Sequence, residues 1–199
     1  MDKGELYAAV TKYTRKPTLT DIYDTWLTET QQRIGTQCRL PEQEQRAKVF
    51  AAGKYIALPN DFIEARKLDY EGWPLQYRTP EQAQALEKCI EPSGGPGYYS
   101  LYDGELQLIP AQPDDSTATL DMIYYAREAP LTVESTTTRV LTKYPYLYLY
   151  GMMIEANIFL ENDTGLQRYM SLFGNMVAEL NDRAARARYS GSTLQMVAR

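Results

Sequence analysis

Few residues in this chain could carry out chemistry, and none of them belongs to a recognised catalytic set. The 199 residues include no histidine, which removes the usual general base and the commonest metal ligand. The two cysteines, Cys38 and Cys89, lie far apart and form no CxxC motif. Neither a zinc site nor a redox pair is therefore predicted. We expect no cofactor and no metal, and a reducing compartment for the two thiols.

Two acidic residues, Glu155 and Asp163, are the best candidates for enzyme chemistry. Glu155 is the only charged residue in the apolar run 145–160, and a buried carboxyl group has a raised pKa that suits a general acid. Two carboxyl groups that share one cleft can hydrolyse a glycosidic bond. An ion pair with a neighbouring helix or a neighbouring subunit is the favoured interpretation of Glu155.

Tyrosine dominates the aromatic residues, with 17 Tyr against 4 Phe and 2 Trp. Such a mixture is typical of half-buried contact surfaces, where the ring is dry and the hydroxyl group is wet. Tyr146, Tyr148 and Tyr150 alternate with apolar residues in the same run as Glu155. On a helix these side chains spread around the circumference, and we predict that they and Glu155 contact the core or a neighbouring subunit.

The C-terminal residues differ in charge from the rest of the chain. Residues 183–199 contain four arginines and no acidic residue. Arginines at a helix end can simply complement the helix dipole. Residues 189–197, however, mix apolar side chains with small ones, which is typical of a tail that docks into a groove on a partner.

The whole chain is acidic, with a formal net charge of -5 and a pI near 4.9. This charge argues against a dedicated nucleic-acid binder, which would need to neutralise phosphates. The longest apolar run is shorter than the roughly 20 residues of a membrane span, so no membrane partner is expected. Met1 is not followed by an apolar signal segment, and we expect the protein to stay in the compartment where it is made.

These residues are positioned by a predicted α+β fold. Apolar periodicity predicts helices near 4–14, 20–38 and 145–162, and a capping box at 164–167 predicts the start of a last long helix. Short strands between 49 and 125 are joined by turns at 71–72 and 103–104, and Thr79 begins a short helix. We therefore predict N-terminal helices (1–45), an inserted antiparallel β domain (46–130), C-terminal helices (131–189) that complete a bundle, and an extended tail (190–199).

The order of these pieces resembles the head-to-tail adaptor proteins of tailed bacteriophages. The pieces include Leu58-Pro59-Asn60-Asp61-Phe62, Tyr124-Tyr125-Ala126 and the helix end Arg188-Tyr189-Ser190-Gly191. The similarity covers nearly the whole chain, and its best motifs are Ile56 to Glu64, Leu106 to Pro110, Tyr148 to Asp163 and the tail. None of these motifs is a catalytic signature. The specificity of the resemblance lies in their order and spacing.

The resemblance implies a structural virion protein of the neck, assembled in the host cytoplasm, and not an enzyme. Such adaptors form a ring, typically dodecameric, beneath the portal, and their β domain faces a tail or nozzle protein. DNA passes through the ring without sequence-specific binding. Because the C-terminal segment of these adaptors reaches into the portal, the resemblance implies these portal-binding residues: Arg183, Arg186, Arg188, Tyr189, Leu194, Met196 and Arg199.

Two other functions remain open at this point. A virion-associated cell-wall hydrolase could act through Glu155 or Asp163, and it would need two carboxyl groups roughly 5 to 10 Å apart. A receptor- or sugar-binding virion module could use exposed rings of Trp73, Tyr98 and Tyr99 beside the glycine-rich loop 91–97.

Overall fold

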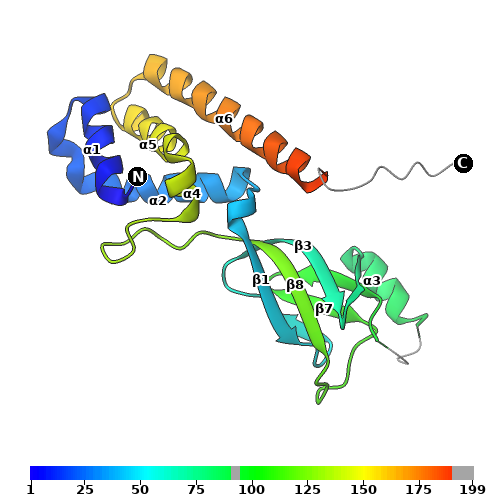
Figure 1. Cartoon of the computed structure of the whole chain (residues 1–199). Helices are drawn as coiled ribbons and strands as arrows, with labels where there is room; N and C mark the ends of the chain where they lie inside the picture. The colour runs from blue at the N-terminus through cyan, green and yellow to red at the C-terminus, as the bar shows by residue number, and fades with distance from the viewer. Residues whose placement is uncertain (91–94, 190–199) are drawn as a thin grey trace, which may run out of the picture. The chain divides into compact units, whose positions relative to one another are not determined.

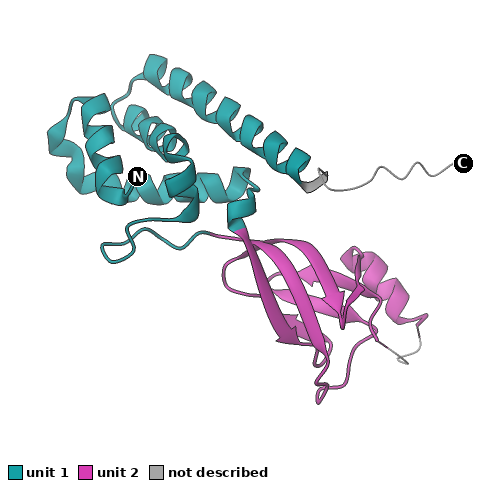
Figure 2. Cartoon of the chain, in the orientation of Figure 1, with its two compact units in different colours: residues 1–43, 128–199 teal, residues 44–127 magenta. Residues whose placement is uncertain are grey.

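The computed structural model describes residues 1–90 and 95–189, with side chains as far as residue 187 (Figure 1). The chain folds into two compact units. Unit 1 comprises residues Met1–Gln43 and Glu128–Arg199, and unit 2 comprises Glu44–Arg127 (Figure 2). Unit 2 is thus inserted into the sequence of unit 1. The α+β class predicted from the sequence is confirmed.

Unit 1 is helical. Its α-helices and 3₁₀ helices are α1 (Lys3–Thr14), η1 (Pro17–Ile22), α2 (Tyr23–Gln37), η2 (Pro41–Gln43), α4 (Arg139–Lys143), α5 (Pro145–Phe159) and α6 (Asp163–Tyr189). Helix α5 packs against α1, α2 and α6, and α6 runs beside it (Figure 1). Nine of the 15 residues of α5 are buried, because a helix that is apolar on all sides must be covered on all sides.

The contact between α2 and α5 depends on a close approach at Gly151. A Cβ atom added at Gly151 would lie 2.4 Å from Cγ2 of Thr30, a fully buried residue of α2. This spacing leaves no room for a larger residue, so glycine at this position lets the two helices pack closely.

The turn between α5 and α6 differs from the sequence prediction. Helix α5 ends at Phe159, earlier than predicted, and Glu161 then takes a positive φ of 51°. The predicted cap at Thr164 is wrong, since the side chain of Asn162 accepts a hydrogen bond from the Gly165 N–H at 3.2 Å. The side-chain amide of Asn162 donates a 2.8 Å hydrogen bond to the side-chain oxygen of Asn157. This bond orients Asn162, the residue immediately before α6, as the N-terminal cap of the helix.

The described residues of unit 2 form two four-stranded sheets around one core. Its elements are β1 (Glu44–Phe50), β2 (Tyr55–Ala57), β3 (Phe62–Tyr70), β4 (Trp73–Pro74), β5 (Gln76–Tyr77), α3 (Pro80–Glu87), β6 (Tyr98–Tyr102), β7 (Glu105–Ile109) and β8 (Thr119–Ala126). The strand orders are β1-β8-β3-β4 and β2-β7-β6-β5. Buried Leu68 and Met122 of the first sheet join Leu106 and Leu108 of the second in this core.

The predicted turns of unit 2 are correct at one hairpin and partly wrong at the other. Strands β6 and β7 pair through the turn at Asp103-Gly104, where Gly104 has a φ of 76°. The turn at Glu71-Gly72 joins β3 to β4, but this hairpin stops at Pro74 and β5 does not continue it. Strand β5 crosses instead to the other sheet and pairs in parallel with β6, because Leu75 between β4 and β5 enters the core.

Replacement of Gly151 by alanine tests the close approach of α2 and α5. We expect Gly151→Ala to lower the free energy of unfolding by about 1–3 kcal/mol, the usual effect of overpacking a core. Gly174 of α6 has no atom within 4 Å of an added Cβ, so Gly174→Ala should raise the free energy of unfolding by roughly 0.5–1 kcal/mol. Urea titration measures both, and equal effects would show that the α2–α5 contact tolerates a wider spacing.

Candidate functional site

The C-terminal half of α6 is anchored to the rest of unit 1. On α6 the side chains of Phe173, Val177, Leu180 and Ala184 are buried, whereas Met170 is 52% exposed. The face of α6 that contacts the core includes these four buried residues and does not include Met170.

Asn181 fixes the end of α6 to the end of α2. Its side-chain oxygen accepts a hydrogen bond from the Arg39 N–H at 3.0 Å, and its amide nitrogen donates to the Gln37 carbonyl at 2.8 Å. Gln37 is the last residue of α2 and Arg39 follows it by two positions, where backbone groups lack helical partners. These two hydrogen bonds hold the C-terminal half of α6 in a fixed position on unit 1.

The predicted portal-binding residues begin on the exposed side of this anchored helix. Arg183 and Arg186 are exposed, and Arg183 forms an ion pair with Glu179 one turn earlier, at 2.6 Å. Helix α6 continues to Tyr189. The side chains of Arg188 and Tyr189, and the residues Leu194, Met196 and Arg199, lie outside the described part of the chain.

A small hollow of about 130 Å³ lies beside these arginines. Apolar surface comes from Pro41, Tyr144, Leu180 and two alanines of α6, and Lys143 and Arg183 add two cations. Lys143 also pairs with Glu42. The hollow has the size of one apolar side chain, and both of its cations are paired with acidic residues of the same chain. Sequence reasoning missed Pro41, Lys143 and Tyr144 because only the fold brings them to α6.

Of the predicted subunit-contact residues, Tyr146 and Tyr150 line the surface of α5. Tyr146 is 57% exposed and its ring centroid lies 6.0 Å from that of Tyr150, which in turn lies 6.2 Å from the ring of Tyr169. The three rings form a row across α5 and α6. Such a row of partly exposed rings is suited to a contact with another protein surface.

Glu155 forms an ion pair with Arg33 of α2. Within one chain, Glu155 thus forms the ion pair with a neighbouring helix that was one of the two favoured interpretations of this residue. Its side chain is 13% exposed, and the guanidinium group compensates the charge that burial would otherwise penalise. Asp163 lies in the first turn of α6, where a carboxylate stabilises the helix.

Of the two surroundings predicted for Tyr148, the structure gives the core of unit 1 and not a subunit contact. Tyr148 is fully buried, and its hydroxyl group donates a 2.5 Å hydrogen bond to Glu128. The same carboxylate accepts hydrogen bonds at 3.1 Å from the Thr138 hydroxyl and the Val140 N–H. Burial and the nearby Glu128 charge raise the pKa of Tyr148. A side chain in this network is unavailable to a neighbour.

The aromatic residues proposed as a sugar platform have different surroundings. Trp73 on β4 is 76% exposed. The guanidinium carbon of Arg78 covers the Tyr98 ring at 4.7 Å. Tyr99 packs against the core and edge-on against Tyr77, and burial raises its pKa. Loop residues 91–94 lie outside the described chain, and Trp73 is the ring best placed to meet a ligand.

The described residues contain no group of three or more His, Cys, Asp or Glu side chains that could hold a metal ion. No helix in the described ranges is long and apolar enough to cross a membrane.

The model of the SU10 adaptor protein family matches residues 1–196. The chain belongs to the SU10 adaptor protein family.

The family match covers both units and most of the C-terminal segment. It confirms the resemblance to head-to-tail adaptors, and membership of the SU10 adaptor family favours a structural role. No curated protein matches the chain.

The Tyr148–Glu128 network predicts a loss of stability at alkaline pH. A phenol whose pKa rises on folding stabilises the protein below its ordinary pKa of 10.0 and loses this contribution as the pH rises further. We expect Tyr148→Phe to lower the free energy of unfolding by about 1–3 kcal/mol at pH 7 and to weaken its decline above pH 10. Exposed Tyr146→Phe is the matched control, and urea titrations at pH 7–11 make the measurement. An unchanged alkaline decline in Tyr148→Phe would contradict the assignment.

Proposed function

We propose that this protein is the head-to-tail adaptor of a tailed bacteriophage. Copies of the chain form a dodecameric ring beneath the portal, connect the capsid to the tail and extend the DNA channel. The protein is located in the virion neck and assembles in the host cytoplasm. The observation that carries the proposal is the family match over residues 1–196.

The portal contact in this proposal is the C-terminal end of α6 and the segment beyond it. The anchor at Asn181 gives this end a fixed position on unit 1, and exposed Arg183 and Arg186 add positive charge. Arg188, Tyr189, Leu194, Met196 and Arg199 extend the same contact. An apolar segment with flanking cations suits a groove with an acidic rim.

The ring contact in this proposal uses the helical unit. Helices α1, α2, α5 and α6 act as one bundle, and the row formed by Tyr146, Tyr150 and Tyr169 gives its exposed surface an aromatic patch. Aromatic rings are enriched in protein–protein contacts because they bury a large area with little loss of side-chain freedom.

The charge distribution supports passage of DNA. Unit 2 holds 13 Asp and Glu against 8 Lys and Arg, whereas unit 1 holds 13 of each kind. The whole net charge of -5 therefore belongs to unit 2. A negative surface repels phosphate, so that a ring of such units lets DNA slide without sequence-specific binding.

The mass of the protein in solution tests the proposal. We expect the purified chain to be a monomer or small oligomer alone and to form a ring when mixed with portal rings of the same phage. Deletion of residues 190–199 should abolish this ring and leave the thermal unfolding of the chain unchanged. A full-length double variant, Leu194→Ser with Met196→Ser, separates loss of apolar contacts from loss of length. A full chain that ignores the portal would contradict the adaptor function.

The arginines of α6 predict a salt-dependent contact. We expect Arg186→Glu to weaken portal binding by about tenfold at low salt and by less at high salt, because exposed charges are screened. Arg168→Glu makes the same charge change at an exposed position near the other end of α6 and should bind normally. Isothermal titration at two salt concentrations measures both, and a salt-independent loss would point to packing in place of charge.

A further inference from the structure

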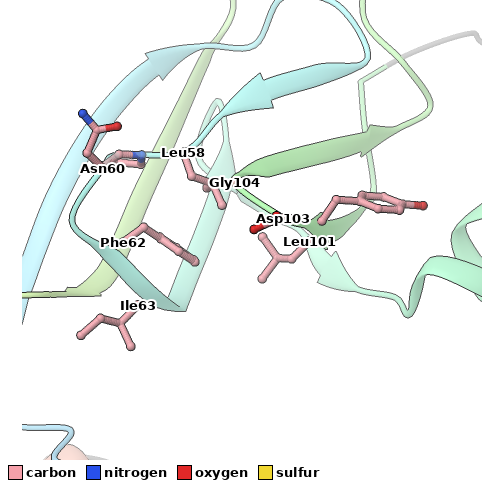
Figure 3. A pocket seen from close by; sticks show the side chains of 9 residues that line it. Leu58, Asn60, Phe62, Ile63, Leu101, Asp103 and Gly104 are labelled. Atoms are coloured by element: carbon pink, nitrogen blue, oxygen red, sulfur yellow. The ribbon is translucent and has the colours of Figure 1, made fainter. Parts of the chain in front are cut away.

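Unit 2 contains a groove that the portal contact does not use. The groove has a volume of about 470 Å³ and is lined by Leu58, Asn60, Phe62, Ile63, Leu101 and Asp103, among others. Figure 3 shows Phe62 and Leu101 pointing toward each other from two sides of this hollow. One wall is the segment that leads from β2 into β3, and the other is the β6–β7 hairpin.

Two strand edges without a partner strand border the groove. Strand β4 pairs with β3 only at Asp69 and Tyr70, so the described chain supplies no strand beside the edge 62–67. Strand β5 pairs with β6 only at Tyr98 and Tyr99, which leaves 100–102 without a strand on that side among the described residues. Exposed edges of this kind can pair with an added strand.

The backbone of Leu101 is the best placed to receive such a strand. On the edge of β6 that faces β5, the Tyr99 carbonyl accepts a 2.8 Å hydrogen bond from the Arg78 N–H. Backbone groups of alternate residues point to the same side of a strand. The N–H and C=O of Leu101 therefore point past the end of β5, toward the open edge.

The walls of the groove are held by contacts within unit 2. The Leu58 N–H donates to the Gly104 carbonyl at 3.0 Å, which ties one wall to the hairpin. The Asp61 carboxylate accepts a 3.0 Å hydrogen bond from the Tyr124 hydroxyl, and the Phe62 ring stacks on Tyr124 at 5.7 Å. Burial and this hydrogen bond raise the pKa of Tyr124 to about 12. The groove is thus shaped before anything binds.

The chemistry of the groove defines what it can hold. Leu58, Phe62 and Leu101 pack partly buried against the core of unit 2, so they offer apolar surface to side chains at alternate positions of a strand. Asp103 and Glu105 are exposed and have no ion-pair partner in the described ranges. With the excess of acidic residues in unit 2, they favour Lys or Arg in the occupant.

We infer that this groove binds an extended segment of the tail-side protein, with apolar side chains at alternate positions and Lys or Arg beside them. The inference rests on the proposed adaptor function, in which the basic C-terminal segment of this chain is engaged by the portal. The bound segment adds a strand at the free edge of β6, and Asp103 meets its cation.

Joining of tails to filled heads tests the inference with the full chain. Asp103→Lys and Ile63→Glu should leave portal binding unchanged and reduce tail joining by about tenfold or more. Asp115→Lys is the matched control, because it makes the same charge change in an exposed turn of unit 2 outside the groove. It should join tails normally.

The outcomes separate the inference from the proposed function. If the unmodified chain does not bind portal rings, the adaptor function fails. If the ring binds the portal and Asp103→Lys joins tails as well as Asp115→Lys does, the groove inference fails. If Ile63→Glu prevents ring formation instead, the groove holds a second copy of the chain, and the inference is overturned.

A second measurement needs no tail protein. Two synthetic heptapeptides serve as probes, one alternating valine with lysine and the other alternating valine with glutamate. In NMR spectra of the ¹⁵N-labelled chain, we expect the lysine peptide to shift the amide signals of Leu101 and Ile63 and to slow hydrogen exchange at Leu101. The glutamate peptide should have no effect, and equal effects of the two peptides would overturn the assigned chemistry.

Discussion

The burial of α5 controls the arrangement of unit 1. Its 15 residues carry one charge, Glu155, so water must be excluded from most of its circumference. Helices α1 and α2 cover it from the N-terminal part of the chain, and α6 covers it from the C-terminal part. Because its cover comes from both ends of the sequence, unit 1 cannot complete its core until both segments are present.

This constraint gives Glu128 its structural importance. Glu128 is the residue at which the chain returns from unit 2 to unit 1, and its carboxylate joins the start of α4 to buried Tyr148 of α5. A charge in such a place is costly unless hydrogen bonds satisfy it. Three donors do so here, which fixes the returning chain on the helix that it must cover.

Sequence reasoning located the elements better than their contacts. The period of apolar residues and the caps marked α1, α3 and α5, and the turn at Asp103-Gly104 fixed the β6–β7 hairpin. The same reasoning could not tell which side of α5 faces the core, so it left Tyr148 between the core and a subunit contact. It also missed that β5 belongs to the second sheet, since Leu75 is buried against core residues that lie far away in the sequence.

The two units have separate hydrophobic cores, one containing Tyr148 and Leu180 and the other containing Leu106 and Met122. An adaptor must hold two different partners, and separate cores let each binding surface change without loss of the other fold. Charge divides in the same way, because unit 1 is balanced and unit 2 carries the entire net charge. In the proposed assembly, the basic end of α6 and the groove with Asp103 on its rim therefore select partners of opposite charge, so that the portal and the tail do not exchange places.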